Sequence, residues 1–317
     1  MKYTILSSMI FLAVTAVAQQ RVALRDGLII DPESNVAYVM AVGGGITAVD
    51  LGTGQARWTS DDAAKPLSII GNVLLSQVEP KNLESRRTLA IAGLDVRKGG
   101  ETSAEGAAPL PLNVQASVDE TLEGRFVTDA RAEDGNAVIS WTFIPSARRE
   151  ARARPRQAAR DEIVGKRKIT DPPSGRLRLD LITGSMTPLS GRSDVALEQQ
   201  WSLMADEIAP TNKPRYRSAD GRHVLESHRI ADDRTWEKYR WVISVRETGA
   251  KIGVIRSHVS FAPFVVRGSV LVFETTPYRH GGGEPQPAKL RGVSLESGQQ
   301  LWAIPVREIV RRAPPPP

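Results

Sequence analysis

Two short motifs recur along this chain in a fixed order, and this repetition constrains the fold more than any other feature of the sequence. The first motif is a strand, a tight turn and a second strand. The second motif is clearest in residues 43–58 (GGGITAVDLGTGQARW), where apolar and polar residues alternate before Thr53 and Gly54. Because glycine takes positive φ at no steric cost, Thr53 and Gly54 predict a hairpin turn that leads into a further strand.

Five copies of both motifs follow one another. The first motif turns at residues 31–35 in the first copy and at a glycine in the others: Gly71, Gly135, Gly221 and Gly268. The second motif has a polar residue shortly before its glycine turn in each copy, and these residues mark the spacing: Asp50, Asp95, Asp180, Ser244 and Ser294. Separations of 45 and 50 residues match the length of a propeller blade, about 40–50 residues, whereas 85 and 64 require insertions.

Each repeat predicts one antiparallel sheet that is too small to bury both of its faces by itself. Stacking such sheets around an axis buries the faces and protects the sheet edges. The sequence therefore predicts an all-β fold, a β-propeller of four-stranded antiparallel blades. Five blades are detected and five to seven fit the length, with a decayed sixth copy placed around 100–123 or 189–212. The alternative is a β-sandwich whose hairpins resemble one another by coincidence.

The stretch from Ala48 to Trp58 (AVDLGTGQARW) resembles the repeat of PQQ-like, quinoprotein-type propellers. That group includes quinoprotein alcohol dehydrogenases and a non-enzymatic lipoprotein of outer-membrane assembly. The resemblance implies that Trp58 and Trp302 dock one blade against the next, and the other three copies have lost this tryptophan. The enzymes of the group use a calcium-binding carboxylate, a catalytic aspartate and often a cysteine pair. No position of this chain matches those residues, so no cofactor is expected.

The start of the chain predicts export. Lys2 precedes a mostly apolar run, and Ala16, Val17 and Ala18 fit the cleavage pattern of a secretory signal peptide. The run is shorter than the roughly 20 residues of a membrane helix, and an uncleaved anchor is the alternative. We therefore expect a signal peptide at 1–18, cleavage after Ala18, and a propeller at 19–310 that is soluble and periplasmic or secreted.

The basic character of the chain is concentrated in one insertion. Residues 147–168 (ARREARARPRQAARDEIVGKRK) have a net charge of +6, which equals the formal charge of the whole chain. We interpret them as a surface loop that presents Arg152, Arg154 and Arg156 to an acidic protein or an anionic part of the envelope. Solvated charge without a ligand is the alternative. The proline-rich tail, 311–317, favours an extended or disordered end, and nucleic acid is not expected for an exported protein.

Motifs that carry chemistry are largely missing from the sequence. The chain has no cysteine, which excludes disulfides and thiolate chemistry, and no metal-binding motif is recognisable. His280 and the three glycines after it imitate an esterase segment, but no nucleophile elbow accompanies them. The sequence favours a non-enzymatic scaffold or protein-binding module. The alternative is a small quinoprotein-type or hydrolytic enzyme with its site in the central funnel.

Overall fold

The computed structural model describes most of the chain from residue 22 to residue 307. The described ranges are 22–25, 27–31, 33–79, 85–112, 115, 124–145, 173–191, 215–230, 237–277, 284 and 286–307. The predicted signal peptide (1–18), the basic insertion (147–168), the glycine-rich segment at 280–283 and the tail (311–317) lie outside these residues. The expectations for those four segments therefore remain predictions.

The described chain forms five antiparallel sheets, and each sheet is built from strands that are consecutive in the sequence. Blade 1 contains β1 (Val22–Arg25), β2 (Leu28–Asp31), β3 (Val36–Met40), β4 (Ile46–Asp50) and β5 (Ala56–Ser60). Blade 2 contains β6 (Lys65–Ile70), β7 (Val73–Gln77), β8 (Thr88–Asp95) and β9 (Glu101–Pro109). Two short 3-10 helices, η1 (Ser85–Arg87) and η2 (Val96–Lys98), lie next to the strands of this blade.

The remaining three blades have four strands each. Blade 3 contains β10 (Gly124–Glu133), β11 (Asn136–Pro145), β12 (Ser174–Leu179) and β13 (Met186–Leu189). Blade 4 contains β14 (Arg215–Arg217), β15 (His223–Arg229), β16 (Tyr239–Val245) and β17 (Lys251–Ser257). Blade 5 contains β18 (Phe264–Arg267), β19 (Val270–Thr275), β20 (Lys289–Ser294) and β21 (Gln300–Pro305).

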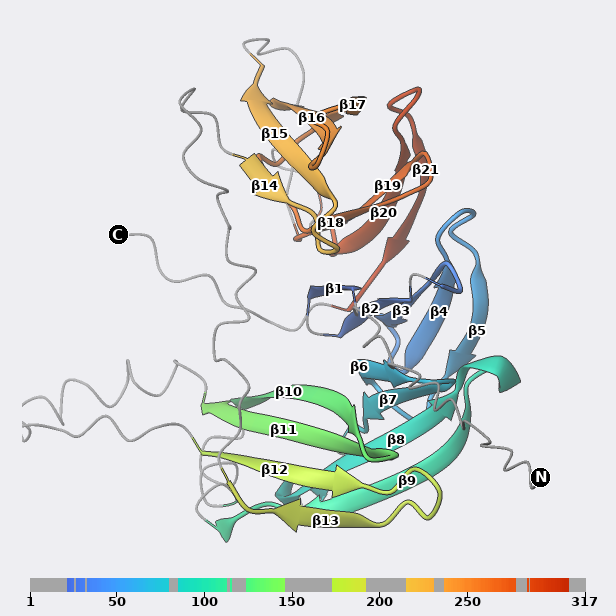
Figure 1. Ribbon diagram of the computed structural model, residues 1–317, viewed down its shortest axis with the longest axis vertical. Helices are drawn as coiled ribbons and strands as arrows, with labels where there is room; N and C mark the ends of the chain where they lie inside the picture. The colour runs from blue at the N-terminus through green and yellow to red at the C-terminus, as the bar shows by residue number, and fades with distance from the viewer. Residues whose placement is uncertain are drawn as a thin grey trace, which may run out of the picture.

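The sheets follow one another around a common centre in chain order, which is the arrangement of a β-propeller (Figure 1). The inner strand β6 contacts both β2 and β10, so blades 1, 2 and 3 meet at the centre. The predicted fold and the five detected blades are confirmed. Residues 101–109 form β9, the outer strand of blade 2, and so do not belong to a further blade. Residues 192–212 lie outside the described chain.

The two outer strands of most blades share one irregularity. In blades 1, 2, 4 and 5 the pairing register shifts by one residue, for example between Ala48 and Val49 and between Gly292 and Val293. Such a bulge adds local twist and helps an outer strand to lean toward the next blade. In blade 3 the residues of β12 from Arg176 to Leu179 pair evenly with β13, without a shift.

The structure corrects the alignment of the second motif in blade 4. In the hairpin of blade 1, Gly54 donates its backbone N–H to the carbonyl of Asp50. In blade 4 the matching bond runs from Gly249 to Val245, so Val245 is equivalent to Asp50 and the predicted Ser244 is wrong by one residue. The position of the left-handed glycine determines where the turn closes. The polarity of the residue four positions earlier does not determine it.

The apolar core is divided among the interfaces between blades. One cluster joins blades 1 and 2, and a second joins blades 2 and 3. A third joins blades 4 and 5, where Trp241 meets Phe273 with ring centroids 5.2 Å apart. The fourth joins blade 5, the last in the chain, to blade 1. Among the described residues no such cluster joins blade 3 to blade 4, and their strands diverge on the left of Figure 1.

Candidate functional site

Trp302 lies between the last blade and the first. Its indole Nε1 donates a hydrogen bond to the carbonyl of Leu51, with a distance of 3.1 Å. Its ring covers Gly54 in blade 1 and Gly292 in its own blade, so that a Cβ at either glycine would overlap the ring. The sequence predicted a blade-docking role for Trp302, and these contacts are of that kind.

Trp58 occupies the same register position in blade 1, because it pairs with Ala48 as Trp302 pairs with Gly292. Its half-buried ring covers Gly100 in blade 2, and its centroid lies 5.6 Å from that of Tyr38. The other three blades place smaller residues at this position: Ala104, Thr187 and Gly253.

Small residues allow other blades to approach one another by backbone contact. A Cβ at Gly184 in the turn of blade 3 would lie 2.5 Å from the carbonyl oxygen of Glu105 in blade 2. A Cβ at Gly253 in blade 4 would lie 2.7 Å from the carbonyl oxygen of Leu295 in blade 5. Four junctions of the ring are therefore closed by an outer strand that packs on the next blade's glycine turn.

The junction between blades 3 and 4 differs from the other four. Within the described chain, nothing lies within 4 Å of the position that a Cβ at Gly249 would take. In this turn Val245 is followed by Arg246, which is exposed. The equivalent residues, Leu51 in blade 1 and Leu295 in blade 5, are buried. Blade 3 has Thr187 at the register position that Trp302 occupies in blade 5. Within the described chain, this junction therefore lacks the side chains that seal the others.

Among the described residues, one face of blade 4 is not packed in an apolar cluster. Leu225, Trp241 and Ile255 face blade 5 and are buried there. The residues that alternate with them on the strands point the opposite way, toward the side of blade 3. We call this second face the seam face. It carries His228, Arg240, Val242, Val254 and Arg256 among its residues.

Three cationic or potentially cationic side chains form one row across the seam face. His228 on β15 pairs directly with Arg240 on β16, and Arg240 pairs directly with Arg256 on β17. Directly paired residues of antiparallel strands lie on the same side, about 4.5–5.5 Å apart at Cβ, and like charges there are destabilising. We call these three residues the cationic row. Such a row costs stability unless an anion accompanies it.

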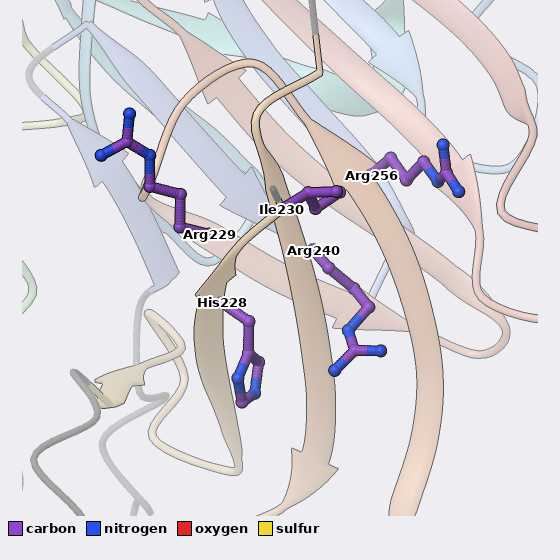
Figure 2. Close-up of a pocket in the computed structure, with 5 residues that line it drawn as sticks. All are labelled: His228, Arg229, Ile230, Arg240 and Arg256. Carbon is purple, nitrogen blue, oxygen red and sulfur yellow. The ribbon is translucent and has the colours of Figure 1, made fainter. Parts of the chain in front are cut away.

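A shallow hollow of about 280 Å³ adjoins the cationic row at the end of blade 4. In Figure 2 the side chains of His228 and Arg240 extend in the same direction, while those of Arg229 and Arg256 extend to either side. Together with Ile230, these four residues line the hollow. A small anionic group placed in the hollow would therefore be surrounded by basic side chains from three adjacent strands.

The guanidinium groups around the hollow have no internal counter-ion in the described part of the chain. No side-chain hydrogen bond or ion pair of Arg229, Arg240 or Arg256 occurs among its residues. The nearby carboxylate of Glu226 is occupied by Arg215, with 2.7 Å from Arg215 Nε to Glu226 Oε1, and lies 3.8 Å from His228 Nε2. Guanidinium groups match carboxylate and phosphate geometry, so this site is suited to bind such an anion.

A second ionic cluster in blade 4 has a different character. Asp220 lies in the turn between β14 and β15 and accepts hydrogen bonds from Ser218 Oγ and from the backbone N–H of Arg222. Its Oδ2 also lies 3.3 Å from Nη1 of Arg267 in blade 5. Burial by itself would raise the pKa of Asp220, but the hydrogen bonds with His223 and Ser218 hold it well below its usual range. This cluster is internally neutralised and ties blade 4 to blade 5.

The cationic row was not predicted from the sequence. Its members are separated by hairpins in the sequence, and only the register of three strands brings them together. The basic residues that were predicted as a contact, Arg152, Arg154 and Arg156, lie outside the described residues. His223 and His228 are both half-buried.

The described inner strands show no arrangement that would hold a metal ion. Among the described residues, no group of three or more His, Asp or Glu side chains is placed to bind a metal ion. The inner strands β2, β6, β10, β14 and β18 contain no histidine. None of the helices in the described part of the chain has the length and apolarity to cross a membrane.

Comparison with known proteins shows similarity to solved structures at low sequence identity. No protein-family profile and no curated protein matches the sequence. Among solved structures, the β-propeller domain of Cps50 (Swd1) from Myceliophteria thermophila is 11% identical, with 87% of this chain and 67% of that chain covered and a TM-score of 0.29.

Two further solved structures are similar at the same level. The Dos1 propeller is 7% identical, covers 86% of this chain and has a TM-score of 0.27, and this chain spans 56% of its length. A europium-containing methanol dehydrogenase is 11% identical, with 88% of this chain and 68% of that chain covered and a TM-score of 0.26. The assignment of this chain as a β-propeller rests on its own five sheets.

Proposed function

We propose that the protein is an exported, non-enzymatic β-propeller that acts as a protein-binding or envelope scaffold module, with a repeat of the PQQ-like type. One observation carries this proposal: the seam face of blade 4 presents Arg240 and Arg256, which have no side-chain counter-ion in the described chain, where the other junctions have an apolar interface. The PQQ-like assignment is supported by Trp58 and Trp302, which cover glycines of the next blade.

The energetics of the seam face favour a binding role. Arg240 pairs directly with Arg256, and like charges paired across neighbouring strands are destabilising. An anionic partner removes that repulsion and adds charge-assisted hydrogen bonds, which are about twice as strong as neutral ones. The cost in the free protein thus becomes a gain in the complex. The same positive surface increases the rate of encounter with an acidic partner.

Two measurements in the native host test the proposal. Export is tested by sequencing the N-terminus of the protein from the extracytoplasmic fraction, which we expect to begin at Gln19. Scaffold function is tested with a photo-cross-linking amino acid at Arg229, which is exposed at the hollow. We expect one discrete adduct with another protein. The same amino acid at Arg97, exposed on blade 2, is the matched control and should give no such adduct.

Two outcomes would contradict the proposal. A mature pool that retains Met1 would show that the protein is not exported by signal cleavage. Cross-linking at Arg229 that yields no adduct, or the same adducts as Arg97, would show that no partner binds at the hollow beside the seam face.

A further inference from the structure

We infer that the seam face of blade 4 binds an extended segment of a partner protein in which a carboxylate and an apolar side chain stand two residues apart. This inference rests on the proposed scaffold function and specifies the chemistry of the partner. It depends on two neighbouring rows of residues on the same face, one cationic and one partly apolar.

The second row lies immediately beside the cationic row. Val242 and Val254 pair directly across β16 and β17, two residues along each strand from Arg240 and Arg256. Both valines are half-buried, so apolar surface remains accessible beside the guanidinium groups. Because a strand rises about 3.3 Å per residue, the two rows are separated by roughly 6.6 Å.

This separation matches the repeat of an extended peptide. Side chains at positions i and i+2 of a strand point the same way and are also roughly 6.6 Å apart. A peptide that lies along the strands of blade 4 with a carboxylate over Arg240 and Arg256 therefore places its next same-side residue over Val242 and Val254. An apolar residue there buries the valines, at about 25 cal/mol per Å² of apolar surface.

The same geometry favours a peptide over a phosphate group. Inorganic phosphate or a lipid headgroup would use the cationic row and leave Val242 and Val254 in contact with water. A peptide with acidic and apolar residues in alternation satisfies both rows at once. Charge complementarity thus selects an anion, and the valines beside the row select a segment of protein.

The experiment uses the mature full-length chain and a synthetic twelve-residue probe of three Glu-Ser-Val-Ser repeats. Binding is measured by isothermal titration calorimetry at low and high salt. We expect saturable binding that weakens with salt. The double variant Arg240→Gln/Arg256→Gln should bind at least tenfold more weakly, a loss of about 1.4 kcal/mol.

Two controls separate this site from general charge effects. The variant Arg97→Gln/Lys98→Gln removes the same charge from an exposed turn of blade 2 and should bind the probe within twofold of the wild type. The nearly isosteric Val254→Thr should weaken binding several-fold, because it places a hydroxyl where the apolar side chain is expected. All variants are first compared with the wild type by circular dichroism and unfolding midpoint.

Three outcomes would overturn the inference. Equal binding of a Gln-Ser-Val-Ser probe would show that carboxylates are not recognised. Displacement by inorganic phosphate, together with unchanged binding to Val254→Thr, would identify a phosphate site. Binding only after Asp194, Glu198, Asp206 and Glu207 are changed to their amides would show that the chain's own residues 192–214 occupy the face. If the probe fails while the adduct at Arg229 persists, the scaffold function stands and the partner chemistry is wrong.

Discussion

At the scale of single residues, glycine and tryptophan decide how the blades meet. Gly54 has φ of +71° and lies beneath Trp302, whereas Gly71 has φ of +57° and open space around it. Both positions need a left-handed conformation, but only Gly54 also needs the absence of a side chain. The two glycines look alike in the sequence, and the tertiary structure separates them.

Replacing these glycines by alanine tests that distinction. Gly71→Ala should cost about 1–2 kcal/mol of unfolding free energy, because an L-residue is strained in the left-handed region. Gly54→Ala should cost clearly more, since its Cβ would displace the Trp302 ring. Chemical denaturation of both variants measures the difference. Equal losses would mean that Trp302 does not pack on Gly54 in solution.

Tyr38 provides a pH-dependent prediction. Its side chain is buried in blade 1, and burial, followed by the charge of Asp31, raises its pKa to about 12. The folded protein therefore favours the neutral phenol, and this contribution to stability is complete below about pH 10 and is lost between pH 10 and 12. Ultraviolet difference titration of the wild type and Tyr38→Phe should show that the variant lacks the phenol that ionises near pH 12. An identical titration of the two proteins would be evidence against this burial.

At the scale of elements, each hairpin depends on how its turn is capped. In blades 1 and 3 an aspartate accepts hydrogen bonds from the backbone N–H groups two and three residues later, as Asp50 does from Gly52 and Thr53. These bonds, after that with Arg57, hold the pKa of Asp50 below its ordinary value. Blade 4 has Val245 at this place and therefore lacks the side-chain acceptor.

Supplying the acceptor should stabilise blade 4. We expect Val245→Asp and Val245→Asn each to raise the unfolding free energy by about 0.5–1.5 kcal/mol, the net value of a hydrogen bond, less whatever apolar contact the valine makes. Ser294 in blade 5 already accepts from Ser297 N–H at 3.2 Å, so Ser294→Asp is a control with a smaller expected gain. Ser244→Asp should not give the gain, because Ser244 is not the turn residue. If Ser244→Asp raised the unfolding free energy and Val245→Asp did not, Ser244 would be the turn residue, as the sequence predicted.

At the scale of the whole molecule, the first and last blades are joined through Trp302 and the segment after β21. Trp302 donates to Leu51, and farther along the chain Arg307 N–H donates to the carbonyl of Met40. The Arg307 guanidinium also forms two bonds of 2.6 Å with Glu79 in the loop after β7. These contacts connect residues more than 200 positions apart, so they stabilise the ring instead of a single blade.

Truncating the indole should weaken this junction strongly. Trp302→Ala should lower the unfolding free energy by about 3–5 kcal/mol, as expected for a buried tryptophan, and Trp302→Phe by less, since most apolar contact is retained. Trp58→Ala should have a smaller effect because Trp58 is only half-buried. Urea unfolding of the three variants provides the comparison. A larger loss for Trp58→Ala than for Trp302→Ala would reverse the assigned importance of the two junctions.

The sequence by itself determined the repeat and most of its strands. Alternating residues, the glycine turns at Gly71, Gly135, Gly221 and Gly268, and the blade-length spacing are local features, so they correctly predicted a β-propeller with the five blades that the described chain contains. Local patterns also placed Trp58 and Trp302 at equivalent positions. The exact start of one turn was missed, because polarity at Ser244 is a weaker constraint than the left-handed glycine four residues after Val245.

Only the tertiary structure decided which junction lacks an apolar seal and which residues gather there. His228, Arg240 and Arg256 belong to three strands, and each is an ordinary basic residue in the sequence. Their proximity is set by cross-strand register. The lack of a side-chain counter-ion for Arg240 and Arg256 in the described chain is set by how blade 4 faces its neighbours. Both depend on the positions of residues far apart along the chain, which local composition and periodicity do not encode.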